Sequence, residues 1–190
     1  SGPVLVEALT GNSAQVGYIS LAIGMYLMVY VTVSQFAQSL IPGLSTLWEA
    51  GRTDEIQRRL GGFMRIGLLV TIPGTLAVWL LAGWAAPLVF GQDFAGAAPA
   101  LRWISLAMPP AVIVWAANVT ATVSGRGAVK FSGFLTALLV FLAGTLALTP
   151  VYGAAGTAAA LSLAVLVQAL VLAVRLRPEF RLSAVWRRAG

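Results

Sequence analysis

The distribution of charge along the chain constrains its fold more than any other feature. Long apolar segments without a charged side chain alternate with short charged clusters, and the longest of these segments are 16–48, 66–92 and 131–174. Charged residues make up 9% of the 190 residues, against roughly a quarter in a typical soluble domain. One soluble core cannot bury segments of this length, whereas a membrane-spanning helix needs about 20 apolar residues. The sequence therefore predicts an all-α polytopic transmembrane helical bundle.

The amino-acid composition excludes several kinds of chemistry. The chain contains no cysteine and no histidine, so disulfides, thiolate or imidazole metal sites and Cys- or His-based catalysis are excluded within this sequence. Its six acidic residues are scattered, and no glycine-rich loop is followed by Lys-Ser or Lys-Thr, as phosphate-binding loops are. We therefore expect a protein that is not an enzyme and that has no metal site and no cofactor.

Five complete membrane spans are expected, at about 16–41, 63–90, 98–123, 131–148 and 153–174. Each is long enough for about 30 Å of hydrocarbon at a rise of about 1.5 Å per residue. The apolar segment before them is too short to cross, so we interpret residues 1–9 as the end of a truncated transmembrane helix. Residues 10–174 then form five transmembrane helices of a C-terminal bundle, and residues 175–190 form a basic tail.

Basic residues are concentrated in every second connection. The connections within 48–65 and 125–130, together with the tail from Arg175, hold 11 of the 12 Lys and Arg residues. The positive-inside rule places this side, and with it the C-terminus, in the cytoplasm. No nucleic-acid partner is expected, because these residues flank apolar spans instead of forming a basic arm or stripe on a soluble fold.

Uncharged polar side chains at membrane depth are candidates for substrate contact. Gln35 and Gln38 share one face of a helix, and Asn118 lies one turn from Thr122 with Trp115 on the same side. Such groups either line a cavity that admits water or hydrogen-bond neighbouring helices together. The second outcome is the more common one.

Two arginines are candidates for binding an anionic head group. Arg102 lies inside the outer half of its expected span, where charge is costly and faces water or the protein interior. It either contacts a phosphorylated lipid head, or it snorkels to the outer interface near Asp93 or pairs with Glu7. Arg65 lies at the cytoplasmic edge, where it either contacts a phosphate at the inner mouth or simply flanks the span.

Prolines interrupt two of the expected spans. Pro73 lies within the second span, and Pro109-Pro110 lies near the middle of the third. Each proline removes a backbone donor, and such breaks persist in membranes where neighbouring groups or a wet cavity satisfy the freed carbonyls. We interpret these positions either as hinges or as tolerated kinks.

The connection 48–65 carries signals for a short helix of its own. Thr53 is a candidate N-cap, and Asp54 and Glu55 precede Arg58 and Arg59 by four residues each, a spacing that allows ion pairs. The glycine pair 61–62 is expected to break or bend the chain before the next span. The segment is either a cytoplasmic coupling element between two moving helices or a solvated surface helix.

The order of several short motifs resembles one transporter family. They are Val16-Gly17-Tyr18-Ile19-Ser20, Ile41-Pro42-Gly43-Leu44-Ser45, Glu49-Ala50-Gly51-Arg52-Thr53-Asp54, Pro73, Pro87-Leu88-Val89-Phe90-Gly91, Asp93-Phe94, Ser124-Gly125-Arg126-Gly127 and the segment 150–158. This succession resembles the C-terminal half of the polysaccharide (lipid-linked oligosaccharide, O-antigen-type) flippases. Their superfamily also contains the lipid II flippases and the multidrug and toxin extrusion antiporters.

The resemblance implies a two-lobe transporter with alternating access, of which this chain would supply most of the second lobe. The expected partners are a polyprenyl-pyrophosphate-linked sugar, membrane lipids and the missing N-terminal helical bundle, and the expected location is the inner (cytoplasmic) membrane. The sites that the sequence offers are Arg102, Arg65, Gln35, Gln38 and Asn118 for substrate, with Pro73, Pro109 and Pro110 as hinges.

Two other functions stay open beside the oligosaccharide-lipid flippase. A cation-coupled multidrug antiporter or a lipid II flippase would share the fold, but the complete spans contain no Asp or Glu for proton or sodium coupling. A non-transporting membrane scaffold would present its basic loops to a synthase, yet it would need neither kinked helices nor polar groups at membrane depth.

Overall fold

The computed structural model describes Gly11 and residues 13–176, and this part of the chain is all helix and connecting turns. Its helices are α2 (Ser13–Ser39), α3 (Ile41–Glu49), α4 (Thr53–Phe90), the 3₁₀ helix η1 (Gln92–Ala97), α5 (Ala98–Ser105), α6 (Met108–Val123) and α7 (Gly127–Arg175). The all-α prediction is confirmed. The predicted helix end at 1–9 and the tail beyond residue 176 lie outside the described residues.

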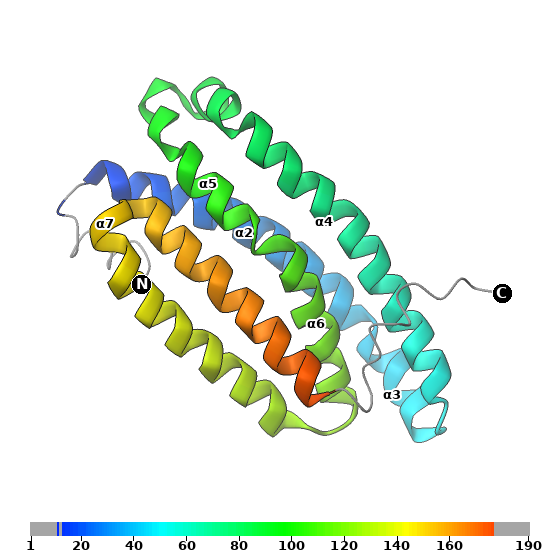
Figure 1. Ribbon diagram of the computed structural model, residues 1–190. Helices are drawn as coiled ribbons and strands as arrows, with labels where there is room; N and C mark the ends of the chain where they lie inside the picture. Colours follow the sequence, from blue (N-terminus) through cyan, green and yellow to red (C-terminus); the bar gives the residue numbers. More distant parts are fainter. Residues whose placement is uncertain (1–10, 12, 177–190) are drawn as a thin grey trace.

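Four continuous or nearly continuous helical segments are long and apolar enough to cross a membrane: Ser13–Glu49, Thr53–Phe90, Gln92–Val123 and Gly127–Arg175. The last of these is two helices, because Gly153 has φ 55° and ψ −132°, which is not a helical conformation. The two arms of α7 lie antiparallel in a hairpin (Figure 1). Contacts between the two arms agree with this: the hydroxyls of Thr149 and Thr157 share a 2.8 Å hydrogen bond, and Gly144 lies against Ala160.

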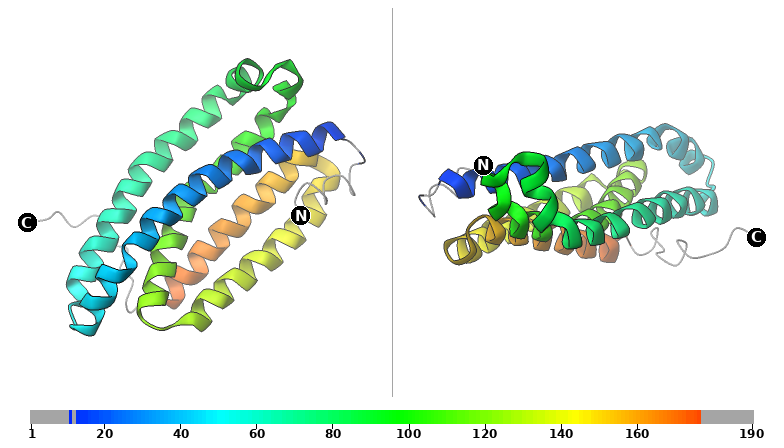
Figure 2. Two further views of the ribbon diagram at one scale, coloured as in Figure 1. Left: turned by 180° about the vertical axis from the view of Figure 1, so that it is seen from behind. Right: turned by 90° about the horizontal axis from the view of Figure 1, so that it is seen from above.

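The helices form a row with one helix laid across it. Helices α5 and α6 lie between α4 and α7, and α2 packs against α5, α6 and α7 on one side of that row (Figures 1 and 2). Helix α6 is the centre of the bundle, with 11 of its 16 residues buried. Close helix approach depends on small residues: a Cβ on Gly67 of α4 would lie 2.6 Å from a methyl group of Val112 on α6.

The outward faces of the bundle are strongly apolar. Along α4, large side chains such as Ile66, Leu69, Leu76, Leu80 and Trp84 are all exposed by more than half of their surface. A water-soluble protein rarely exposes a continuous apolar face of this kind. The bundle is therefore built to sit in lipid, which agrees with the polytopic membrane fold expected from the charge pattern.

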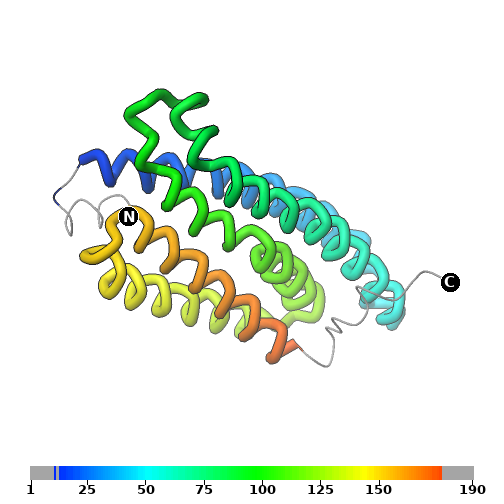
Figure 3. The backbone as a smooth tube through the Cα atoms, turned by 45° about the horizontal axis from the view of Figure 1, so that its top comes forward, coloured from blue at the N-terminus to red at the C-terminus, as the bar shows by residue number. Residues whose placement is uncertain are grey.

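The connections rich in basic residues lie at one end of the bundle. The turn at 50–52, the turn at 124–126 and the end of α7 lie together there, whereas η1 and the turn at Gly153 lie at the other end (Figures 1 and 3). We call the end that holds the turns 50–52 and 124–126 the basic end. The turn at the opposite end is held by Gln15 at the start of α2, whose side-chain oxygen accepts a 2.9 Å hydrogen bond from the N–H of Ala154.

The connection 48–65 differs from the predicted short helix. Helix α4 begins at Thr53 and continues through Gly61-Gly62 into the membrane-spanning part, and the residue before it, Arg52, makes no side-chain cap. Thr53 is the first residue of α4 and not its N-cap, and the helix does not break at Gly61-Gly62, so these two predictions are wrong, while the alternative of a bend at the glycine pair stays a prediction. Helical hydrogen bonding continues because packing of the buried residues Leu60 and Gly61 outweighs the weak helix propensity of glycine.

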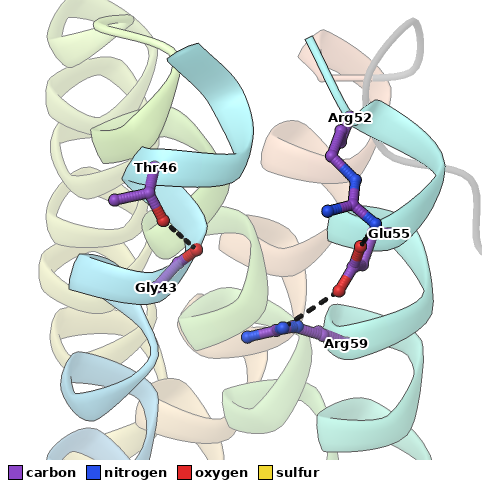
Figure 4. Close-up of polar contacts among 5 residues, drawn as sticks. All are labelled: Gly43, Thr46, Arg52, Glu55 and Arg59. Atoms are coloured by element: carbon purple, nitrogen blue, oxygen red, sulfur yellow. Dashed lines mark hydrogen bonds and ion pairs between the residues drawn. The ribbon is translucent and has the colours of Figure 1, made fainter. Parts of the chain in front are cut away.

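Glu55 organises the first turns of α4 instead. Its two carboxylate oxygens pair with Arg52 at 2.6 Å and with Arg59, one turn further on, at 3.0 Å (Figure 4). Arg59 also lies against Gly43 of α3, where an added Cβ would stand 3.4 Å from the guanidinium. This ion-pair cluster joins α3 to α4 at the basic end. Among the described residues, the predicted Asp54–Arg58 pair is absent.

The break between α5 and α6 has a clear cause in the proline pair. The helix is interrupted at Leu106–Ala107, and Pro109-Pro110 occupy the first turn of α6, where a missing N–H costs nothing. Proline 109 cannot donate to the carbonyl of Ser105, four residues earlier, and the hydroxyl of Thr75 on α4 bonds this carbonyl at 3.0 Å. Ser162 of α7 likewise donates to the carbonyl of Trp103. Neighbouring helices therefore satisfy the broken backbone.

Candidate functional site

A pocket of about 390 Å³ opens between α2, α6 and both arms of α7, near the basic end. Its polar lining comes from four elements: Tyr30 of α2, Trp115 and Asn118 of α6, Lys130 at the start of α7 and Gln168 on its second arm. Phe131 and Phe134 complete the wall on the first arm. We call this the α6–α7 pocket.

Two polar atoms of residues that line this pocket have no hydrogen-bond partner among the described residues. They are the side-chain oxygen of Asn118 and the indole Nε1 of Trp115, both fully shielded. Asn118 as a whole is 9% exposed. A buried donor or acceptor without a partner costs about 1–3 kcal/mol, and native structures contain few of them. Two residues of the pocket wall therefore carry an acceptor and a donor whose hydrogen bonds are unmade.

The aromatic wall of the pocket is rigid. The rings of Tyr30 and Trp115 lie 5.2 Å apart between centroids, and Tyr26 follows on the other side of Tyr30 at 5.5 Å. Tyr26 is buried and packs in the main core. Packing from behind thus fixes the orientation of the Tyr30 and Trp115 rings.

The charge of the pocket is positive. Among the residues that the structure describes, Lys130 is the one charged residue of the lining, and no carboxylate lines the pocket. The neighbouring Arg175, at the end of α7, is held by a 2.7 Å hydrogen bond from Nη1 to the hydroxyl of Ser132. The sequence positions this lysine as a flanking charge; the fold brings it beside the amides of Asn118 and Gln168.

Arg102 lies far from this pocket, on α5 near the opposite end of the bundle. Its Nε donates a 3.0 Å hydrogen bond to the carbonyl of Trp79 on α4, and its guanidinium lies 3.5 Å from where a Cβ on Gly83 would stand. Within the described part of the chain Arg102 forms no ion pair, with Asp93 or with any other acid, and its expected snorkelling to the interface near Asp93 stays a prediction. Glu7, the other predicted partner, lies outside that part.

The remaining predicted substrate residues are on exposed faces. Gln35 and Gln38 lie on the exposed face of α2, and Arg65 is exposed on α4. Of the five predicted substrate residues, the fold therefore brings Asn118 alone into the α6–α7 pocket. Gln35 and Gln38 remain available to a surface that packs against α2.

A second cavity is an apolar groove of about 520 Å³ between α2 and α4. Its walls include Met28 and Phe36 of α2 and Ile66 and Val70 of α4, and its few polar lining groups are threonines. The hydroxyls of both threonines, Thr32 and Thr71, donate hydrogen bonds to carbonyls one turn back in their own helices. The groove suits a lipid chain more than a polar head.

Sequence reasoning missed Tyr30, Lys130 and Gln168 as parts of one site. Gln168 carried a usable signal, because it is the one amide side chain in the apolar segment 153–174. Lys130 carried none, since a lysine at a span end is explained by membrane orientation alone. Tyr30 is one of several aromatic residues on its helix.

Comparisons with known proteins bear on the fold. No protein-family model and no curated protein matches the sequence. Among solved structures the chain is similar to the "Lipid II flippase MurJ, inward closed conformation", with a TM-score of 0.75 and 17% sequence identity over 90% of this chain. It spans 37% of the length of that protein. At this identity the similarity shows the fold: a helical arrangement found in a lipid flippase.

Proposed function

We propose that this chain is one lobe of a two-lobe membrane transporter that flips a lipid-linked oligosaccharide across the cytoplasmic membrane by alternating access. The basic end faces the cytoplasm, as the positive-inside rule expects. The transporter assembles when a second helical bundle packs against the exposed face of α2. Residues 10–174 supply five of its transmembrane helices, and the basic tail lies in the cytoplasm.

The observation that carries this proposal is the shared fold. A TM-score of 0.75, with 90% of the chain covered, relates the bundle to part of a lipid II flippase. Fold alone does not determine function, but the physical features of this chain suit the same task. A sugar–pyrophosphate head needs a polar, cationic cavity, while its polyprenyl tail can stay in lipid. The α6–α7 pocket is a polar, positively charged cavity for the head, and the groove between α2 and α4 is an apolar surface for the tail.

Residues with predicted roles keep them in this proposal. Arg65 contacts the phosphate at the inner mouth, and Gln35 and Gln38 line the cavity between the lobes. Arg102 contacts the head group near the outer side during release. Pro73 and the pair Pro109-Pro110 act as hinges. The helix break before Pro109-Pro110 is tied to α4 by the hydrogen bond from the Thr75 hydroxyl to the carbonyl of Ser105.

A second candidate is transport of lipid II itself. The specific observation in its favour is that the structural neighbour is a lipid II flippase. The cation-coupled antiporter has less support, because no Asp or Glu lies in the segments 16–41, 63–90, 98–123, 131–148 and 153–174.

Transport by the full-length protein in liposomes separates these candidates. We expect flipping of a fluorescent polyprenyl-pyrophosphate oligosaccharide, measured by its loss of accessibility to a membrane-impermeant quencher. Lipid II and a cationic dye serve as parallel substrates in the same vesicles. Faster flipping of lipid II would favour the second candidate, whereas export of the dye alone would reject the flippase.

A further inference from the structure

We propose that the α6–α7 pocket binds the phosphate-bearing first sugar of the transported lipid, with Lys130 holding the phosphate and Asn118 and Trp115 a sugar hydroxyl. This inference rests on the proposed function and deepens it, because it assigns a head-group site to residues of this lobe.

The unpaired polar atoms indicate a hydroxyl-bearing ligand. The oxygen of Asn118 needs a donor and the Nε1–H of Trp115 needs an acceptor. A sugar hydroxyl offers both in one group. The amide of Gln168 lines the same pocket and adds another donor and acceptor. A volume of about 390 Å³ lies in the range of pockets for small ligands, so it suits one sugar with its phosphate better than a long oligosaccharide.

The charge of the pocket selects an anion. Lys130 supplies three donors and a full positive charge at the pocket wall, and no carboxylate is among the described residues that line it. An organic cation would find aromatic rings in Tyr30 and Trp115, but it would also meet the ammonium group of Lys130. Like charges within one pocket repel, so an aromatic cage for a cationic drug is disfavoured.

The surroundings of the pocket suit a ligand with a lipid tail. Phe131 and Phe134, on its rim, expose 66% and 59% of their surface on the outer face of α7. A prenyl chain leaving the pocket can lie along these rings within the hydrocarbon. The lining residues Gly127 and Lys130 belong to the first turn of α7 and place the pocket near the basic end, where a substrate made on the cytoplasmic side would enter.

Binding to the full-length protein in nanodiscs tests this site. The probe is farnesyl-pyrophosphate-linked N-acetylglucosamine; farnesyl pyrophosphate, which lacks the sugar, and N-acetylglucosamine 1-phosphate, which lacks the lipid, are the comparison ligands. Loss of a charged hydrogen bond costs about 1.5–3 kcal/mol, so Lys130→Gln should weaken binding at least about tenfold. Lys130→Arg should retain most of the affinity. The control Arg58→Gln removes one exposed charge at the same end and should change affinity less than about twofold.

Asn118→Leu provides a readout that a structural role would not give. Because the Asn118 oxygen is unpaired without ligand, an apolar residue of similar size should leave the thermal stability of the empty protein equal or higher. The same change should weaken probe binding several-fold, and it should affect farnesyl pyrophosphate less than the sugar-bearing probe. Lower stability together with unchanged affinity would show a structural amide and would overturn the assignment.

The outcomes separate this inference from the proposed function. If Lys130→Gln and Asn118→Leu bind the probe and flip lipid-linked sugar as the unmodified protein does, the pocket holds water and the inference fails while the function stands. If the unmodified protein binds N-acetylglucosamine 1-phosphate at this pocket but flips no lipid-linked sugar, the site stands and the proposed function fails. Tighter binding of a cationic dye in Lys130→Gln would identify the pocket as a drug site.

Discussion

Replacing Thr75 by valine should destabilise the bundle although the two side chains have almost the same shape. Thr75 is buried, at 7% exposure, and its hydroxyl supplies the hydrogen bond that Pro109 cannot give to the carbonyl of Ser105. The substitution leaves that carbonyl without a side-chain donor inside the membrane. An unpaired buried group costs about 1–3 kcal/mol, while interhelical bonds in membranes average about 0.6 kcal/mol with a maximum near 1.7. We therefore expect a loss of about 1–2 kcal/mol.

The neighbouring Thr71 is a matched control for this measurement. It is buried on the same helix, at 5% exposure, but its hydroxyl bonds the carbonyl of Gly67 in its own helix. Thr71→Val removes a hydroxyl without leaving a broken backbone unsatisfied, so it should change stability by less than about 0.5 kcal/mol. Thermal unfolding in detergent should show a midpoint about 2–6 °C lower for Thr75→Val than for Thr71→Val. Equal midpoints would refute the account of the α5–α6 break.

Three further predictions concern the turn at Gly153, Arg102 and the topology. Gly153→Ala should destabilise the fold by about 1–3 kcal/mol in the same thermal assay, because the backbone there is open to glycine alone and the new Cβ would stand 2.6 Å from the Gln15 oxygen; an unchanged midpoint would contradict the described turn. Arg102→Ala should lower stability by about 1 kcal/mol through loss of the bond to Trp79, and it should also lower transport through loss of the proposed head-group contact; lower stability with normal transport would leave Arg102 a structural role alone. Cysteines at Ser13, Gln92 and Val151 should react with a membrane-impermeant reagent outside intact cells, whereas those at Thr53, Ala128 and Ser183 should not; labelling at Ala128 would reverse the topology.

The fold class was predictable from sequence because it depends on features that a linear pattern contains. Uncharged segments such as 131–174 exceed what a soluble core can hold, and the structure confirms the helical bundle. The Gly61-Gly62 break was wrong because local propensity is weak beside tertiary packing: Gly61 is buried where α4 packs. Pro109-Pro110 did mark an interruption, but the helix breaks just before them, at Leu106–Ala107.

The candidate site was predictable only in part. Asn118 stood out as an amide at membrane depth, with Trp115 on the same face, and the fold keeps that pair together. Its association with Lys130 and Gln168 depends on the reversal at Gly153, which brings the two arms of α7 side by side. The expected spans 131–148 and 153–174 already separate the two arms, but the register in which the arms pack against each other and against α6 determines which residues meet, and no spacing rule contains that register. For Arg102 the sequence left a head-group contact, snorkelling and a pair with Glu7 open; within the described residues its guanidinium donates to a helix carbonyl, that of Trp79.

The most direct test of the central claim, alternating access by a rocking lobe, is the two-sided accessibility of one residue. Gln35 lies on the exposed face of α2, and this chain has no native cysteine, so Gln35→Cys gives a single reporter in a full-length protein otherwise free of cysteine. In sealed vesicles of defined orientation, a membrane-impermeant maleimide should label this cysteine from either side. Adding lipid-linked sugar should raise the labelling rate from one side and lower it from the other. Labelling from one side alone, at a rate that substrate does not change, would contradict alternating access and favour a static membrane scaffold.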